Sequence, residues 1–180
     1  MTAENDMAEC GIWDREGSCL IPLALLETLP EYFRKIIPPD YLDLMGHMNI
    51  RWYFDMFAKS GRKFFTAHGL GEDYFRDGNF GVFTLKQYIQ YFAEVRVGQT
   101  VAIHTRLTGR SDKRFHFIHF MINETTTQLA ATFEALITHA DLKIRRGAPM
   151  PAYIAQKFDA TLDKDAKLDW EAPVCGAMRV

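Results

Sequence analysis

A short polar segment, Asp43-Leu-Met-Gly46-His47-Met-Asn49, contains the residue types and spacing in this sequence that are best suited to chemistry. A carboxylate such as that of Asp43 can act as a general base, or as a nucleophile on a carbon bonded to oxygen. Asn49 precedes a pattern typical of a helix, and the free backbone N–H groups at a helix start, such as that of Ile50, can bind an oxygen with negative charge. The segment therefore combines a carboxylate with a site for an oxyanion.

Each of these residues also has a structural interpretation. An aspartate before a helix is most often a cap or turn residue, so Asp43 has that alternative role. Asn49 is a good N-cap candidate, and Gly46 suits the backbone geometry of a tight turn. His47 can simply hydrogen-bond the backbone of the turn, and Tyr53, one helical turn further on, is more often a core residue. The residues alone leave both interpretations open.

The helix that positions this segment is predicted to begin after Asn49 and to end at His68, with Gly69 in a left-handed conformation. Its apolar residues follow the i, i+3, i+4, i+7 spacing of a helix packed against another element. They are Ile50, Tyr53, Phe54, Phe57, Gly61, Phe64 and Phe65.

Strand patterns lie on both sides of the helix. One strand precedes it, at residues 32–41, with Pro38 and Pro39 near its end. Four more strands follow, at residues 81–92, 101–107, 114–123 and 129–139. Short turns join the last three strands, which predicts an antiparallel meander. The expected fold class is α+β, an antiparallel five-stranded sheet wrapped around one long central helix.

The order of these patterns predicts three regions. Residues 1–31 form an N-terminal arm, in which 1–19 are mobile or loosely packed and 20–29 are either helical or extended. Residues 32–146 form the domain. Residues 147–180 form a C-terminal extension, with a short helix at 153–158 followed by a charged, solvated stretch at 159–169.

Composition excludes several classes of function. The 180 residues carry a formal net charge of −2, which gives no electrostatic case for nucleic acid. No apolar run approaches the roughly 18 residues of a membrane span, and the acidic N-terminus is wrong for a secretory signal. The three cysteines form no CxxC, which favours reduced thiols in the cytoplasm. The sequence has no Gly-x-Ser-x-Gly elbow, no phosphate loop and no metal-ligand cluster.

The turn and the element order resemble the hotdog-fold acyl-CoA thioesterases of the 4-hydroxybenzoyl-CoA thioesterase type. The family turn has an Asp, two variable residues, a Gly, and then an Asn and a Tyr, which match Asp43, Gly46, Asn49 and Tyr53. The segment IIPPDYLDLMGHMNIRWY is especially similar to thioesterases that act on betainyl-CoA and are fused to, or encoded beside, carnitine dehydrogenases. One departure is Lys86, in the strand after the helix, where these relatives have an acidic residue. A lysine there argues against a cationic substrate such as betainyl-CoA.

The resemblance implies a thioester hydrolase without metal or cofactor. Asp43 would be the general base or the nucleophile, and the N–H near Ile50 would bind the oxyanion. His47 would line the acyl pocket or contact the leaving thiol, Asn49 would fix the oxyanion donor, and Gly46 and Tyr53 would belong to the substrate site.

The resemblance also implies a site for coenzyme A and an oligomeric state. The phosphates of coenzyme A need cations, for which two clusters are candidates, Arg110, Lys113 and Arg114, and Lys143, Arg145 and Arg146. Exposed sheet edges have unpaired backbone groups, and hotdog relatives pair two such sheets edge to edge. The resemblance therefore implies a homodimer or a dimer of dimers with sites built from two chains. Two alternative functions remain, a hotdog enoyl-CoA hydratase and a non-catalytic acyl-CoA-binding protein.

Overall fold

The computed structural model describes residues 10–13 and 19–180. Most of the segment expected to be loosely packed, residues 1–9 and 14–18, lies outside the described residues, as do the side chains of Cys10 and Cys19. Strand β1 (Cys10–Trp13) pairs antiparallel with β2 (Cys19–Pro22), and helix α2 (Leu23–Glu27) follows directly. The stretch 20–29 is thus partly extended and partly helical, because Pro22 ends the strand and stands at the N-cap of α2.

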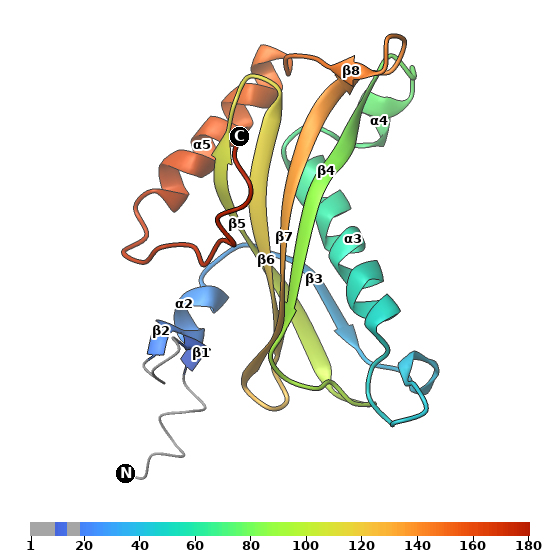
Figure 1. Ribbon diagram of the computed structural model, residues 1–180, viewed down its shortest axis with the longest axis vertical. Helices are drawn as coiled ribbons and strands as arrows, with labels where there is room; N and C mark the ends of the chain where they lie inside the picture. Colours follow the sequence, from blue (N-terminus) through green and yellow to red (C-terminus); the bar gives the residue numbers. More distant parts are fainter. Residues whose placement is uncertain (1–9, 14–18) are drawn as a thin grey trace. The chain divides into compact units, whose positions relative to one another are not determined.

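The main sheet has the strand order β3-β5-β6-β7-β4, with the short β8 paired to β7 (Figure 1). Its strands are β3 (Glu31–Ile36), β4 (Phe80–Tyr91), β5 (Thr100–Arg110), β6 (Arg114–Asn123), β7 (Gln128–Asp141) and β8 (Arg146–Gly147). The predicted meander of β5, β6 and β7 is confirmed. β8 was not predicted, because two residues are too few to produce a pattern.

The first strand ends earlier than the sequence suggested. β3 stops at Ile36, and the 3-10 turn η1 (Pro39–Tyr41) takes the place of its expected last residues. The physical reason is the Pro38-Pro39 pair, since proline has no N–H to donate to a neighbouring strand.

The helix α3 (Ile50–Ala67) has the predicted start, and Gly69 after it has the expected positive φ of +91°. Helix α4 (Glu72–Phe75) is short. Helix α5 (Ala152–Asp165) is longer than predicted. The stretch 159–169 is exposed or half-buried, as predicted, except for Asp165, which is buried. None of the helices in residues 10–13 and 19–180 is long and apolar enough to cross a membrane.

The chain divides into two compact units, each described by itself. The first contains the residues up to Ser60 with 89–105 and 119–132, and the second contains 61–88, 106–118 and 133–180. In the first unit, the fully buried Phe57 of α3 stacks on the His119 ring of β6, with ring centroids 6.0 Å apart. His119 Nδ1 also lies 2.7 Å from the Thr105 hydroxyl of β5. The Phe57–His119 contact therefore packs this half of α3 on the sheet.

In the second unit, the core is a cluster of phenylalanines. Phe64 of α3 contacts Phe117 of β6 with centroids 5.1 Å apart, and Phe115 stacks on Phe158 of α5 at 4.7 Å. His68 lies 4.4 Å from Phe158 by ring centroids. Removing a buried Phe side chain costs about 3–5 kcal/mol, so this cluster contributes substantially to the stability of the unit.

The buried His119 predicts a pH dependence of stability. Burial lowers the pKa of His119 from 6.5 to about 3, so the folded protein keeps this ring neutral while the unfolded chain protonates it. The contribution of the neutral His119 ring to the free energy of unfolding is therefore fully present above pH 6.5. It is lost as the pH falls towards about 3, by about 1.4 kcal/mol per pH unit.

His119→Gln retains a hydrogen-bonding side chain and cannot titrate in this range. We expect urea unfolding to show a weaker loss of stability between about pH 6 and about pH 5 for this variant than for wild type. If the free energies of unfolding of wild type and His119→Gln fell in parallel with pH, the pH dependence could not be assigned to His119.

Candidate active site

The segment 42–48 is a closed turn. Asp43 N–H donates to His47 O at 2.9 Å, and Gly46 N–H donates to Asp43 O at 3.1 Å. Leu42 and Met48 form an isolated antiparallel bridge at the neck of the turn. Gly46 has a φ of +81°, a conformation that glycine adopts without strain, so its role here is the geometry of the backbone.

The two carboxylate oxygens of Asp43 have different surroundings. Oδ1 accepts the N–H of Met45 at 2.8 Å and the N–H of His47 at 3.4 Å, which holds the turn together. Within the described part of the chain, Oδ2 has no hydrogen-bond partner. One oxygen therefore has the structural role and leaves the second available for chemistry.

The start of α3 lies directly after this turn. Asn49 N–H donates to Tyr41 O at 2.9 Å, and Asn49 Oδ1 accepts the N–H of Arg51 at 3.0 Å, so the predicted N-cap is present. Tyr41 also stacks on Trp52, with ring centroids 3.8 Å apart, which fixes the first turn of the helix. Among the described residues, nothing accepts the N–H of Ile50. This is the group that the sequence predicted as the oxyanion donor.

Four of the predicted site residues meet in one cavity of about 340 Å³ in the first unit. It is lined by Asp43, His47, Met48, Ile50, Tyr53, Tyr91, Phe92, Ala93 and Glu94. Burial raises the pKa of Tyr53 to about 12, so its hydroxyl stays protonated at neutral pH. Tyr53 and Tyr91 meet edge to face, with centroids 5.1 Å apart, and form an aromatic wall.

Glu94 is the functional candidate that the sequence did not indicate. Its Oε2 lies 2.9 Å from His47 Nε2 and 3.2 Å from an Arg96 guanidinium nitrogen. Met48 N–H donates to Val95 O at 2.7 Å, and this bond holds the segment after β4 against the turn. No local pattern marks Glu94, because the contact joins residues about 47 positions apart.

The six predicted cations have different surroundings in the second unit. Arg110 is engaged by Asp159, with Nε to Oδ1 at 2.6 Å, and this hydrogen bond raises the pKa of Arg110 and lowers that of Asp159. Lys113, Arg114 and Arg146 line a cavity of about 370 Å³ together.

The charges of these three cations are uncompensated. None of Lys113, Arg114 and Arg146 has an ion-pair partner in residues 10–13 and 19–180. Lys143 and Arg145 do not line this cavity, and the Arg145 guanidinium lies 5.2 Å from the centre of the Phe83 ring. The structure thus brings together members of two clusters that the sequence treated as separate.

Lys86 does not line the cavity of Asp43. Its ammonium donates to Ala177 O at 2.7 Å, in the second unit. The objection that this lysine raised against a cationic substrate therefore has no support in the lining of the cavity.

Comparisons with known proteins give a consistent result. The model of the thioesterase-like superfamily matches residues 37–158. An L-carnitine dehydrogenase/betainyl-CoA thioesterase of Agrobacterium fabrum is 30% identical over 119 residues, 66% of this chain and 24% of that protein. A betainyl-CoA thioesterase of Pseudomonas aeruginosa is 25% identical over 134 residues, 74% of this chain and 84% of that protein. The chain thus spans about a quarter of the length of the first relative.

Solved structures show the same fold at low sequence identity. A Staphylococcus aureus protein solved in complex with CoA matches with a TM-score of 0.75 and 18% identity, over 84% of this chain and 96% of that one. A 1,4-dihydroxy-2-naphthoyl-CoA thioesterase from Synechocystis matches with a TM-score of 0.65 and 18% identity, over 74% of this chain and 98% of that one. These likenesses, with the element order above, confirm the predicted α+β hotdog fold.

The N-cap gives a prediction on stability. Asn49→Ala removes the acceptor of the Arg51 N–H, and we expect a loss of about 0.5–2 kcal/mol in the free energy of unfolding. Asn49→Asp retains a side-chain oxygen at the same position and should remain close to wild type. Urea unfolding of the three proteins measures the difference. If the Asp and Ala variants were equally destabilised, the cap would not be the source of the effect.

Proposed function

This chain belongs to the thioesterase-like superfamily, and from that premise we propose that it hydrolyses an acyl-CoA thioester to a free acid and CoA. A fold alone does not define a reaction, so the proposal depends on the site. The observation that carries it is the cavity that Asp43 and Ile50, the first residue of α3, line together. The thioesterase names of the curated relatives agree with it.

In the proposed reaction, the thioester carbonyl oxygen accepts the Ile50 N–H, which polarises the carbonyl carbon. As a base, Asp43 takes a proton from water, and the water oxygen bonds to that carbon. The tetrahedral intermediate then collapses, the C–S bond breaks, and the CoA sulfur leaves with the proton. As a nucleophile, Asp43 bonds to the carbon itself, expels the thiolate and forms an anhydride that water hydrolyses. The arrangement is compatible with both routes.

His47 has a supporting role in this proposal. Its Nε2 is held by the Glu94 carboxylate at 2.9 Å, which fixes the orientation of the ring in the cavity. A carboxylate that orients a histidine is a common arrangement in sites that move protons. We assign to Glu94 the positioning of His47, and to His47 a contact with the leaving sulfur or the acyl group.

The cavity of Lys113, Arg114 and Arg146 is the proposed site for the phosphates of CoA. Its three cations have no anionic partner among the described residues, and phosphate oxygens pair well with such groups. Arg110 has a weaker claim, because Asp159 already binds its guanidinium.

The lining of the Asp43 cavity also favours a particular acyl group. Tyr53, Tyr91 and Phe92 provide aromatic rings, and Asp43 and Glu94 provide negative charge. Aromatic faces and carboxylates together favour a cation, including a quaternary ammonium group. We therefore propose an acyl group with a positive charge, in agreement with the betainyl-CoA thioesterases among the relatives.

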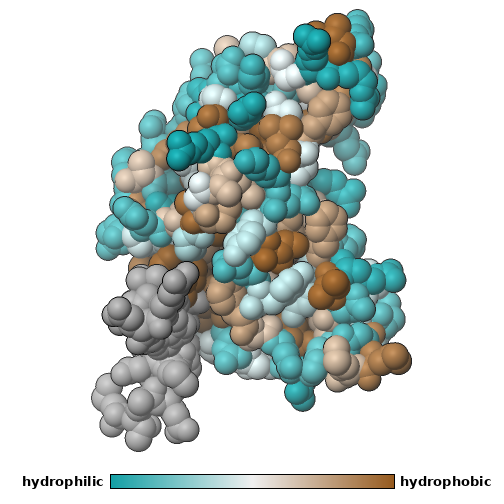
Figure 2. Space-filling view, in the orientation of Figure 1, coloured by the Kyte–Doolittle hydropathy of each residue, from teal (hydrophilic) through white to brown (hydrophobic). Residues whose placement is uncertain are grey.

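The surface around the cavity supports the proposed assembly from two or more copies. Leu44, Met45, Ile50, Tyr91 and Phe92 are large, exposed apolar residues near the turn or in the cavity wall. Figure 2 shows that apolar residues also lie among hydrophilic ones on one face of the molecule. A second copy would cover such residues, so we propose a homodimer or a dimer of dimers.

The first functional prediction isolates Asp43. Asn at this position can still accept the Met45 N–H, which preserves the turn, but it is neither a base nor a carboxylate nucleophile. Asp43→Asn should therefore keep the melting temperature of wild type and lower kcat by about 10²–10⁴. The measurement is thiol release from a panel of acyl-CoAs, beside a melting curve.

Two controls complete this experiment. Asp43→Ala also loses the turn acceptor, so it should lower both the melting temperature and the rate. An Asp43→Asn protein with more than about a tenth of wild-type kcat would remove Asp43 from the mechanism. A wild-type protein that shows a saturable thermal shift with acyl-CoAs but releases no thiol would be a binding protein instead.

A matched pair of substrates tests the charge of the acyl group. Betainyl-CoA and tert-butylacetyl-CoA have nearly the same shape and differ in the positive charge. We expect kcat/KM to be at least about tenfold higher for betainyl-CoA, which corresponds to about 1.4 kcal/mol. Glu94→Gln should reduce this ratio, because it removes one negative charge from the cavity. Lys86→Met, outside the cavity, should leave the ratio unchanged. A wild-type ratio near one would contradict the proposal.

A further inference from the structure

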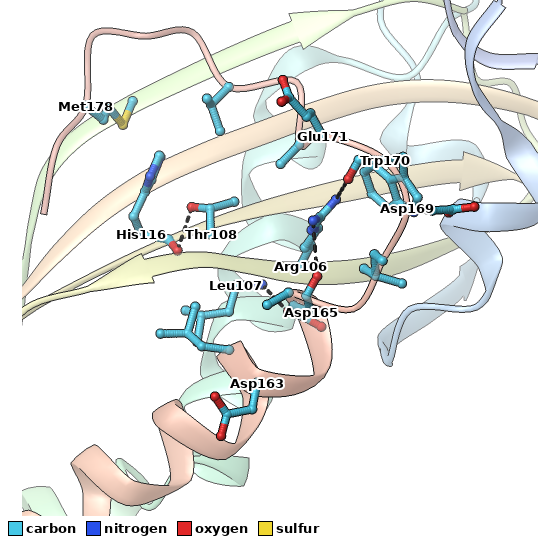
Figure 3. A pocket seen from close by; sticks show the side chains of 15 residues that line it. Arg106, Leu107, Thr108, His116, Asp163, Asp165, Asp169, Trp170, Glu171 and Met178 are labelled. Carbon is cyan, nitrogen blue, oxygen red and sulfur yellow. Dashed lines mark hydrogen bonds between the residues drawn. The ribbon is translucent and has the colours of Figure 1, made fainter.

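The second unit contains a cavity of about 810 Å³ that the proposed reaction does not use. It lies between the β5–β6 hairpin, the end of α5 and the segment after it, as Figure 3 shows. Its volume is in the range of about 300–1,000 Å³ that small-molecule sites occupy in proteins.

His116, on β6, is one of the polar residues that line this cavity. The residue is 7% exposed, and its Nε2 lies 2.7 Å from Oε1 of Glu134, which is 2% exposed. Glu134 Oε2 accepts the N–H of Cys175 at 2.7 Å, so both oxygens of this carboxylate are occupied. Nδ1 of His116 has no hydrogen-bond partner among the described residues.

These contacts determine what the floor of the cavity offers to a ligand. Glu134 Oε1 accepts a hydrogen bond from Nε2–H, and in this tautomer Nδ1 presents a lone pair. Thr108 Oγ1 donates its only proton to His116 O at 2.9 Å, which leaves this oxygen as an acceptor. Both polar groups on the floor therefore accept hydrogen bonds, and a ligand must supply the donor.

The charges around the cavity indicate the sign of the charge that a ligand should carry. Figure 3 shows the side chains of Asp163, Asp169 and Glu171 around the cavity, and all three residues are exposed. The cation of the wall, Arg106, donates to Trp170 O at 2.7 Å and lies over the Trp170 ring at 4.1 Å. Asp165 also lines the cavity, so four acidic residues stand against one guanidinium and the formal charge of the lining is negative.

The remaining wall is apolar. Leu107, Leu162, Leu168, Val174 and Met178 line it beside Trp170. We propose that this cavity binds an organic ammonium ion, a protonated primary or secondary amine with an apolar body. Its N–H groups donate to His116 Nδ1 and Thr108 Oγ1, and its body contacts the apolar wall.

The experiment uses phenethylammonium as the probe and isothermal titration calorimetry of the full chain. We expect saturable binding of one equivalent per chain. Phenethyl alcohol lacks the charge and phenylpropionate has the opposite charge, so both should bind at least about tenfold more weakly. Phenethyltrimethylammonium has the charge but no N–H donor, and it should also bind more weakly than the primary amine.

Variants then locate the binding. Asp169→Asn/Glu171→Gln changes exposed carboxylates and should weaken binding by about threefold to tenfold without a change in melting temperature. Thr108→Val should weaken binding as well. Glu72→Gln/Asp73→Asn removes the same charge from the exposed helix α4 and should leave binding unchanged.

Two results would overturn the proposal. One is the absence of saturable binding of phenethylammonium at about 5 mM, and the other is tighter binding of phenylpropionate than of the amine. Equal affinity of wild type and the Asp169→Asn/Glu171→Gln variant would also contradict it. Asp43→Asn should bind the amine like wild type, so this result is independent of the proposed thioesterase activity.

Discussion

The hydrogen bond from Asn49 N–H to Tyr41 O is the contact on which the candidate active site depends. It joins the 3-10 turn η1 to the residue that caps α3. Because the two ends of the segment between them are held together, that segment forms a tight loop. Asp43 in that loop and Ile50 at the start of the helix line the same cavity. Because Asn49 binds with both its backbone and its side chain, one residue sets the end of the loop and the start of the helix.

Local patterns predicted the parts of the structure that local forces determine. The start of α3, the glycine after its end and the strands β5, β6 and β7 follow from short segments of sequence, and the structure has each of them. The predicted apolar stripe of α3 is only partly right, because Ile50 and Phe54 are exposed while Met56, outside that stripe, is fully buried. The three strands are buried along nearly their whole length instead of on alternate residues. The turn from Asp43 to Asn49 was also visible, because Gly46 and the cap belong to one short segment.

Contacts between distant segments were not visible in the sequence. Glu94 becomes part of the site because Met48 N–H binds Val95 O. Arg110 seemed free to bind a phosphate, yet Asp159 of α5 occupies it. Asp165 seemed solvated, yet it is buried with its Oδ2 on the Leu107 N–H at 2.9 Å. In each case the identity of the partner depends on how strands and helices meet, which periodicity does not encode.

The segment after α5 is attached in an unusual way, through its backbone. Arg106 binds Trp170 O, Glu134 binds Cys175 N–H, and Lys86 binds Ala177 O. Every residue type except proline presents the same amide groups, so most substitutions at Cys175 or Ala177 leave these attachments intact. The course of the segment is therefore robust at these positions, while its exposed side chains are free to diverge and the buried Trp170 and Met178 are not. Over evolution, relatives of this chain can acquire new chemistry beside the sheet without rebuilding the sheet itself.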